Sequence, residues 1–152
     1  SSVWQITQQD CEGQVITRFR PIELPRTMRV RYPSWGESLM VHQERGNLIL
    51  VATEMAAVMG YVDLESQAEQ GIAQMHHLIV GKEQRRQGIG SALLERAILS
   101  ARKEGLERIM TTVQSKNNPG IRFLQQRGFK FCGYNERYYR NSDIALYFVS
   151  TV

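Results

Sequence analysis

The residues best suited to chemistry form a short basic turn that contains two glycines. The turn consists of Arg85, Arg86, Gln87, Gly88, Ile89, Gly90 and Ser91. Glycines let the backbone approach a ligand closely, and the unpaired amides at the start of a helix attract anions. The turn therefore predicts an anion site, and a purely structural strand-to-helix turn is the alternative. It lacks the Lys-Ser/Thr of a P-loop and the third glycine of a dinucleotide-binding fold.

The segments beside this turn have the periodicity of a strand, a helix and a second strand. Residues 72–80 are largely apolar and predict a strand. From Ile89 the apolar residues fall on one helical stripe, and Gly105 is placed to end that helix. Residues 108–113 are rich in β-branched side chains and predict the next strand. A parallel crossover unit is therefore expected around the turn.

The rest of the chain predicts further strands and one more helix. Residues 48–53 and 57–63 read as a hairpin, and residues 129–134 and 143–149 as the last two strands. Asn118 and Pro119 are expected to supply the N-cap and first-turn proline of a helix that Gly128 stops. The first 46 residues carry scattered arginines and prolines, which indicate short strands and loops.

Two motifs in the right order resemble the GNAT superfamily of N-acetyltransferases. The first is its pyrophosphate loop and the second follows 29 residues later; the matching residues are Arg85, Gly88, Gly90, Asn117, Gly120, Gly128 and Phe129. The resemblance implies an α/β (α+β) fold, with a mixed, mostly antiparallel central sheet splayed at its fourth and fifth strands and flanked by helices. It implies one domain over 1–152, with an atypical part at 1–46 and a cofactor-binding core at 47–150.

The same resemblance implies a site for acetyl-coenzyme A as cosubstrate. Leu78, Ile79 and Val80 would offer backbone groups to the pantetheine arm. The diphosphate would be held at Arg85, Arg86, Gln87, Gly88, Ile89, Gly90 and Ser91, and Asn117 would contact the cofactor or position its arm. A splayed gap between the strands at 72–80 and 107–113 would admit the cosubstrate.

The resemblance further implies transfer of the acetyl group to a primary amine by direct attack in a ternary complex. The acid that family members often supply as Tyr falls at Leu124, and the usual glutamates fall at Thr112 or Gln74. His76 is then the candidate base, because an imidazole accepts protons near neutral pH. A packed histidine is the structural alternative for His76 and for its neighbour His77.

The proton for the departing thiolate has three further candidates in the last strands. They are Tyr134, Tyr138 and Tyr139, although core or rim packing is the commoner role of such tyrosines. Positioning alone can also lower the barrier to direct attack, so the reaction does not require a dedicated acid. The acceptor, a small-molecule or peptide amine, is not specified by these residues.

Two other functions compete with the enzyme. Without the usual Tyr and Glu, the chain could be an acyl-coenzyme A-binding sensor or scaffold. A nucleic-acid surface is disfavoured, because the prolines interrupt the basic opening and no aromatic stacking motif accompanies it. That opening contains Arg18, Arg20, Arg26, Arg29 and Arg31. A homodimer is compatible with the family resemblance.

Composition narrows the class of protein. The chain has 152 residues, of which 42% are hydrophobic and 22% charged, with a net charge of +4, as in ordinary globular domains. Cys11 and Cys132 with His42, His76 and His77 show no metal-ligand spacing, so no metal is predicted. The polar first residues resemble no signal peptide and no apolar run is long enough to cross a membrane, so we predict a cytoplasmic location.

Overall fold

The computed structural model describes residues 1–28 and 39–152. The chain divides into two compact units, of which one comprises Ser1–Ser34 and Val113–Phe148 and the other Trp35–Thr112 and Val149–Val152. Because of this division, a single domain over the whole chain stays a prediction. Arg29 and Arg31 of the basic opening lie outside the described residues.

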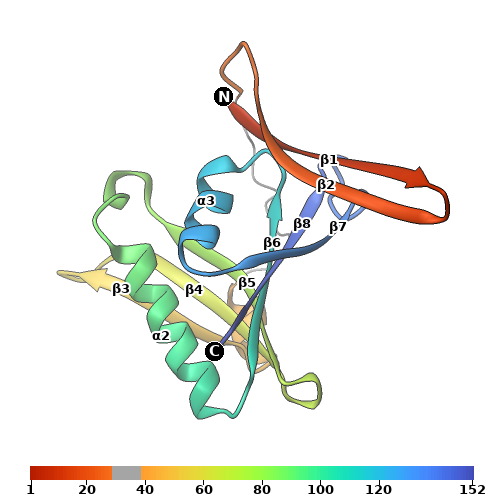
Figure 1. Ribbon diagram of the computed structural model, residues 1–152. Coiled ribbons are helices and arrows are strands. Elements are labelled where there is room, and N and C mark those ends of the chain that lie inside the picture. Colours follow the sequence, from red (N-terminus) through yellow and green to blue (C-terminus); the bar gives the residue numbers. More distant parts are fainter. Residues whose placement is uncertain (29–38) are drawn as a thin grey trace. The chain divides into compact units, whose positions relative to one another are not determined.

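A hairpin begins the sheet of the second unit, as predicted from its apolar segments (Figure 1). After the short helix α1 (Leu39–Glu44), strand β3 (Leu48–Glu54) pairs antiparallel with β4 (Ala57–Gln67). The two linking residues, Met55 and Ala56, both have positive φ angles, of 49° and 66°. A two-residue turn of this kind matches the twist of the flanking strands, although glycine or asparagine usually occupies it.

Strand β5 (Ile72–Val80) has the bounds predicted from sequence and pairs antiparallel with β4. A short 3-10 helix, η1 (Ala68–Gln70), connects the two strands. A second one, η2 (Lys82–Gln84), connects β5 to the glycine turn. Helix α2 (Ile89–Lys103) follows and packs against β3, β4 and β5 (Figure 1). Its apolar stripe is buried as expected: Leu93, Leu94, Ala97 and Ala101.

The strand after α2 completes the predicted crossover. β6 (Arg108–Gln114) runs parallel to β5, and Gly105, with φ of 74°, separates it from the helix. The six-stranded sheet has the order β3-β4-β5-β6-β8-β7. Because β3 pairs antiparallel with β4 and β4 pairs antiparallel with β5, the predicted mixed sheet with flanking helices is confirmed.

The first unit is built on a hairpin that the sequence did not specify. Strands β1 (Ser2–Cys11) and β2 (Gln14–Glu23) are each ten residues long, rather than the short strands expected from the prolines. Phe19 of β2 stacks between Trp4 of β1 and Phe131 from a later strand, at centroid distances of 4.3 and 4.1 Å. Such stacked aromatic pairs add stability beyond the area that they bury.

This unit also contains helix α3 (Asn118–Gln126) and strand β7 (Lys130–Asn135). The last strand, β8 (Ala145–Thr151), crosses the boundary between the units. Ile121 and Leu124 are buried on α3, and Gly128, with φ of 86°, follows its end, all as predicted. In the part of the chain that the structure describes, no helix combines the length and apolarity needed to span a bilayer.

Candidate active site

The glycine turn, residues 85–91, leads into α2, and no side chain covers the start of this helix. Gly88 is the N-cap with φ of 82°, no side chain caps the helix, and the first turn contains no acidic residue. A Cβ added at Gly88 would meet no heavy atom within 4 Å. The first amides of a helix have no partner within the helix and carry its positive dipole end. The predicted anion site therefore has the backbone that an anion needs.

The two arginines before Gly88 have different geometries. The Arg85 guanidinium donates from Nε to the carbonyl oxygen of Val80 at 3.2 Å, so it ties the turn to the end of β5. Arg86 is exposed and has a positive φ of 64°, which is uncommon for a residue with a side chain. The turn thus contains two left-handed residues, Arg86 and Gly88, on either side of Gln87.

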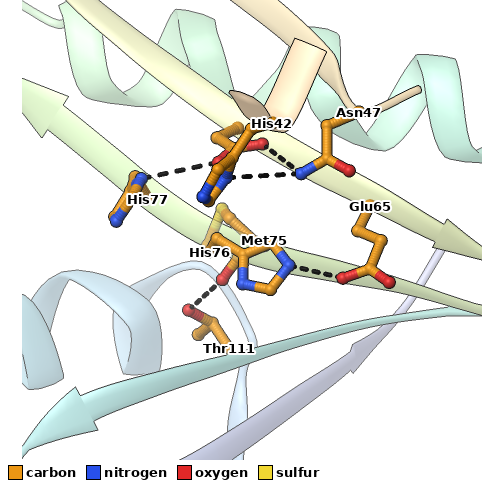
Figure 2. A network of polar contacts seen from close by, with 8 residues as sticks. His42, Asn47, Glu65, Met75, His76, His77 and Thr111 are labelled. Carbon is orange, nitrogen blue, oxygen red and sulfur yellow. Dashed lines mark hydrogen bonds and ion pairs between the residues drawn. The ribbon is translucent and has the colours of Figure 1, made fainter. Parts of the chain in front are cut away.

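Strand β5 leaves its parallel partner well before it reaches this turn. The ladder between β5 and β6 contains four pairs, from Ile72–Arg108 to Met75–Thr111, while β5 continues to Val80. At the last pair, the Thr111 hydroxyl donates to the carbonyl oxygen of Met75 at 3.0 Å (Figure 2). In the register that the structure describes, Leu78–Val80 has no partner on β6, which is the splay that the fold prediction required.

A β-bulge in β5 lies where the ladder ends. The register with β4 changes from Asp63–His77 to Leu64–Met75, so His76 is an extra residue. Partners across an antiparallel pair share a face of the sheet, and alternate residues of a strand do so as well. His77 therefore lies on the face of Asp63, whereas without the bulge it would share the face of Met75. The bulge thus changes which residues of β5 share a face, and the sequence alone cannot exclude such a bulge.

His76 lies on that same face and meets a carboxylate. Its Nε2 is 2.6 Å from Oε2 of Glu65, which is two residues after Asp63 on β4 (Figure 2). The side chains of His76 and Glu65 are 30% and 43% exposed, so this pair is accessible to solvent. An ionised carboxylate only accepts hydrogen bonds, so Nε2 of His76 is the donor in this contact, and Nδ1 holds a lone pair in the neutral ring.

Asp63 is the centre of a second, buried network. Its Oδ2 is 2.5 Å from Nδ1 of His42 and 3.5 Å from Nδ1 of His77, while its Oδ1 accepts from the Asn47 amide at 2.9 Å. The Asp63 side chain is 0% exposed. Burial is the main effect that lowers the pKa of His77, and it outweighs the opposing effect of the Asp63 charge. His77 is therefore held in its neutral form.

Three side chains of this network, those of His42, Asp63 and His77, are candidate metal ligands. The candidate ligand atoms of His42, Asp63 and His77 all lie within 4.8 Å of one another. Two ligands of one tetrahedral zinc ion stand roughly 3.3 Å apart, given bond lengths of about 2.0–2.1 Å. The 2.5 Å between Nδ1 of His42 and Oδ2 of Asp63 is much shorter than this ligand separation and is that of a short hydrogen bond. We therefore treat the cluster as a hydrogen-bonded network.

Comparison with known proteins decides the family. A profile described as "Acetyltransferase (GNAT) family" matches residues 13–129, more than half of the chain. The chain belongs to the GNAT acetyltransferase family. A search of curated proteins found no match.

Solved structures agree with this family on the fold. A nourseothricin acetyltransferase has a TM-score of 0.77 at 21% identity, over 99% of this chain and 84% of that one. A Bacillus anthracis protein assigned as a streptothricin acetyltransferase, in complex with acetyl coenzyme A, has a TM-score of 0.72 at 18% identity, over 99% and 83%. The ribosomal-protein-S18-alanine N-acetyltransferase from Escherichia coli has a TM-score of 0.69 at 20% identity, over 80% and 79%.

The second GNAT motif corrects one sequence prediction. Asn117, not Asn118, is the N-cap of α3, and its Oδ1 accepts from the amide of Gly120 at 3.0 Å. Asn118 is the first residue of the helix, and its Oδ1 instead accepts from the indole nitrogen of Trp4 at 3.1 Å. The spacing of three between Asn117 and Gly120 in the motif is thus the spacing of a capping hydrogen bond.

The residue at the usual acid position of a GNAT enzyme is buried. Leu124 is buried in the first unit with 5% of its surface exposed. Among the tyrosines considered as proton donors, Tyr139 is buried, and burial raises the pKa of its hydroxyl well above the usual range. Tyr139 is therefore a weaker acid than an ordinary tyrosine, whereas Tyr138 is 42% exposed.

Sequence reasoning missed most of the buried network. Asp63 and Glu65 are two residues apart on one strand, a spacing that places both carboxylates on one face. That signal could have linked them. His42 is 21 residues before Asp63 and lies in a helix of six residues without a periodic pattern. Nothing in its sequence surroundings indicates its partner.

Proposed function

We propose that this chain is an acetyl-coenzyme A-dependent N-acetyltransferase that moves the acetyl group to a primary amine. The single observation that supports this most is the course of the backbone from β5 to α2. The strand loses its parallel partner after Met75, and ten residues beyond it the glycine turn opens an uncapped helix. An extended edge suits a pantetheine arm, and helix amides suit a diphosphate.

Within this proposal, each predicted cofactor residue has a defined task. Leu78, Ile79 and Val80 offer backbone groups to the arm. The amides from Arg86 to Ser91 bind the diphosphate, while Arg85 fixes the turn through its bond to Val80. Asn117, which caps α3, remains a predicted contact of the cofactor.

The chemistry is direct attack of a neutral amine on the thioester carbonyl in a ternary complex. One N–H bond of the acceptor ammonium must break before the amine can attack. We assign this proton to His76, because Glu65 orients its ring and because the side chain is partly exposed. No covalent acyl-enzyme is needed, and holding the reactants together can lower the barrier by about 7–11 kcal/mol.

The acceptor belongs to the amines that carry a positive charge in water. Asp63 and Glu65 share one face of the sheet with the histidines, and with neutral imidazoles they give that face a net negative charge. The similar solved structures include acetyltransferases of small molecules and of a ribosomal protein. Both small-molecule and peptide amines therefore belong in an acceptor panel.

The proposal is tested by a pair of glutamate substitutions at the two ends of α2. Gly88 and Gly105 have φ angles of 82° and 74°, and an added Cβ at either meets nothing within 4 Å. Gly88→Glu and Gly105→Glu therefore carry similar backbone strain, about 1–2 kcal/mol each. Calorimetric titration should show that Gly88→Glu loses acetyl-coenzyme A and that Gly105→Glu binds it as the wild type does.

Equal affinities in the two variants would contradict the placement of the diphosphate. Catalysis is measured separately, as thiol release from acetyl-coenzyme A with a panel of amines. Tight binding without turnover of any amine would instead favour an acyl-coenzyme A sensor or scaffold. The observation that favours this second function is the buried Leu124, which occupies the position of the usual acid.

A further inference from the structure

The outer half of the β1–β2 hairpin, residues 7–18, is exposed on both faces. Every residue from Thr7 to Arg18 is exposed, whereas Trp4 and Phe19, nearer to the open end of the hairpin, are partly buried and stack on each other. The two strands form a sheet of their own, and no third strand pairs with them in the part of the chain that the structure describes (Figure 1). An isolated two-stranded hairpin is at best marginally stable in water. A further strand beside this hairpin would therefore stabilise its outer half.

The two edges of this hairpin differ. On the β1 edge, the amide of Trp4 donates to the carbonyl oxygen of Ser115 at 2.9 Å, so this edge contacts another segment of the same unit. Trp4 lies opposite Pro21 of β2, and two residues opposite each other in an antiparallel ladder direct their backbone groups either both toward the partner strand or both away from it. Proline fits an outward position, because it has no N–H. The outward positions of β2 are therefore every second residue from this proline: Pro21, Phe19, Thr17 and Val15.

The β2 edge lacks the features that usually protect an edge strand. Such strands are often blocked by a proline, a lysine or a β-bulge. Between Gln14 and Arg20 the sequence contains neither proline nor lysine, and the ladder with β1 has no shift of register. Val15 and Ile16 expose 67% and 39% of their surface there. This edge is therefore open to another strand, and its two charged residues, Arg18 and Arg20, favour a partner that carries an acidic residue.

We propose that β2 pairs antiparallel with β2 of a second copy of this chain, about a two-fold axis at Ile16, so that the two hairpins form one four-stranded sheet. This axis places Ile16 opposite Ile16 of the second copy, which covers an exposed apolar side chain. It also places Val15 opposite Thr17 of the second copy, so the outward N–H and C=O groups of these residues bond across the axis. An axis at Thr17 would instead place the apolar Ile16 opposite the charged Arg18.

Charge distinguishes a second copy from an unrelated strand. Opposite charges across a strand pair stabilise it, and like charges opposite each other destabilise it. Glu12 in the hairpin turn and Arg20 lie four residues to either side of Ile16 in the sequence. The axis therefore sets Glu12 level with Arg20 of the second copy, and the two-fold symmetry produces this pair twice. Arg20 donates one N–H to Gln5 at 3.4 Å, and a guanidinium has further donors for a carboxylate. The β2 edge is thus complementary in charge to itself.

Sedimentation analysis of the full chain tests which edge is used. The wild type should reach twice the 17.5 kDa of one chain at high concentration and dissociate on dilution, since the interface is small. Thr17→Pro removes an outward N–H from the proposed edge and should stay monomeric from about 10 µM to about 1 mM. Gln8→Pro is the matched control, because Gln8 lies opposite Thr17 and is outward on the β1 edge, and it should dimerise as the wild type does. A wild type that is monomeric at about 1 mM, or a Thr17→Pro variant that dimerises as Gln8→Pro does, overturns the proposal.

A second pair of variants leaves the backbone ladder intact and tests the axis. Glu12→Arg and Arg20→Glu each set like charges level with each other, so each variant alone should raise the Kd of the dimer about tenfold. An equal mixture of the two variants restores an opposite charge at both places and should dimerise as the wild type does. A mixture that dimerises no better than either variant alone overturns the axis at Ile16. Neither measurement uses turnover, so failure of the proposed acetyltransferase function would leave these outcomes unchanged.

Discussion

Replacing Gly60 by alanine should strain the backbone where β4 pairs with residues 78–80 of β5, the predicted contact of the pantetheine arm. Gly60 pairs with Val80, and an added Cβ would lie 2.6 Å from the carbonyl oxygen of Ile79 and 3.2 Å from Cα of Val80. Both neighbours are backbone atoms, so the strands must separate. Overpacking of this kind costs roughly 1–3 kcal/mol. For a chain of this length that corresponds to a decrease in Tm of roughly 2–12 °C.

The control is the corresponding change in another strand. At Gly133 in β7 an added Cβ meets only Tyr147, at an ordinary contact distance of 3.5 Å. Gly133→Ala should therefore leave the free energy of unfolding in urea unchanged or slightly increased. Calorimetry should also show weaker binding of acetyl-coenzyme A to Gly60→Ala. If Gly60→Ala and Gly133→Ala are equally stable and bind equally well, the close approach of the two strands at Val80 is refuted.

Three further predictions concern single interactions. Thr111→Val removes the hydroxyl that donates to the carbonyl oxygen of Met75 and should lower the free energy of unfolding in urea by about 0.5–1.5 kcal/mol. An unchanged free energy of unfolding would show that this hydrogen bond does not contribute to stability. Asn117→Ala removes the cap of α3 and should cost about 0.5–2 kcal/mol in the same assay, whereas Asn117→Asp, which keeps the cap, should not. His77 has a lowered pKa in the folded state, so its neutral form stabilises the protein above about pH 6.5 and this contribution is lost as the pH falls. Unfolding measured from pH 7.5 to 5 should depend less on pH in His77→Gln than in the wild type, and identical slopes would contradict the assignment.

Local patterns were sufficient to predict the strand and the helix on either side of the glycine turn, where the cofactor site is proposed. Strand Ile72–Val80 and helix Ile89–Lys103 have strong periodicities and are separated by a glycine turn, so their positions follow from the sequence. Gly105 and Gly128 both adopt the left-handed conformation expected after a helix. These features depend on residues close together in the chain, and for that reason they were predictable.

The site chemistry depends on long-range features that no local pattern reveals. One extra residue in β5, His76, moves His77 to the face of Asp63, and only the pairing with β4 reveals it. Likewise, the contact of His42 with Asp63 depends on how a six-residue helix docks on the sheet. The Asn117 cap was missed by one residue because two asparagines are adjacent and either could cap. Register and docking are tertiary properties, which the sequence alone left undetermined.

The most direct test of the central idea is a titration of nitrogen-15-labelled protein with acetyl-coenzyme A, observed by amide NMR. If backbone amides at the start of α2 bind the diphosphate, the resonances of Gly88 and Gly90 should show the largest shifts in the spectrum, and desulfo- or free coenzyme A should reproduce them. Unchanged Gly88 and Gly90 resonances at saturating acetyl-coenzyme A would contradict the account.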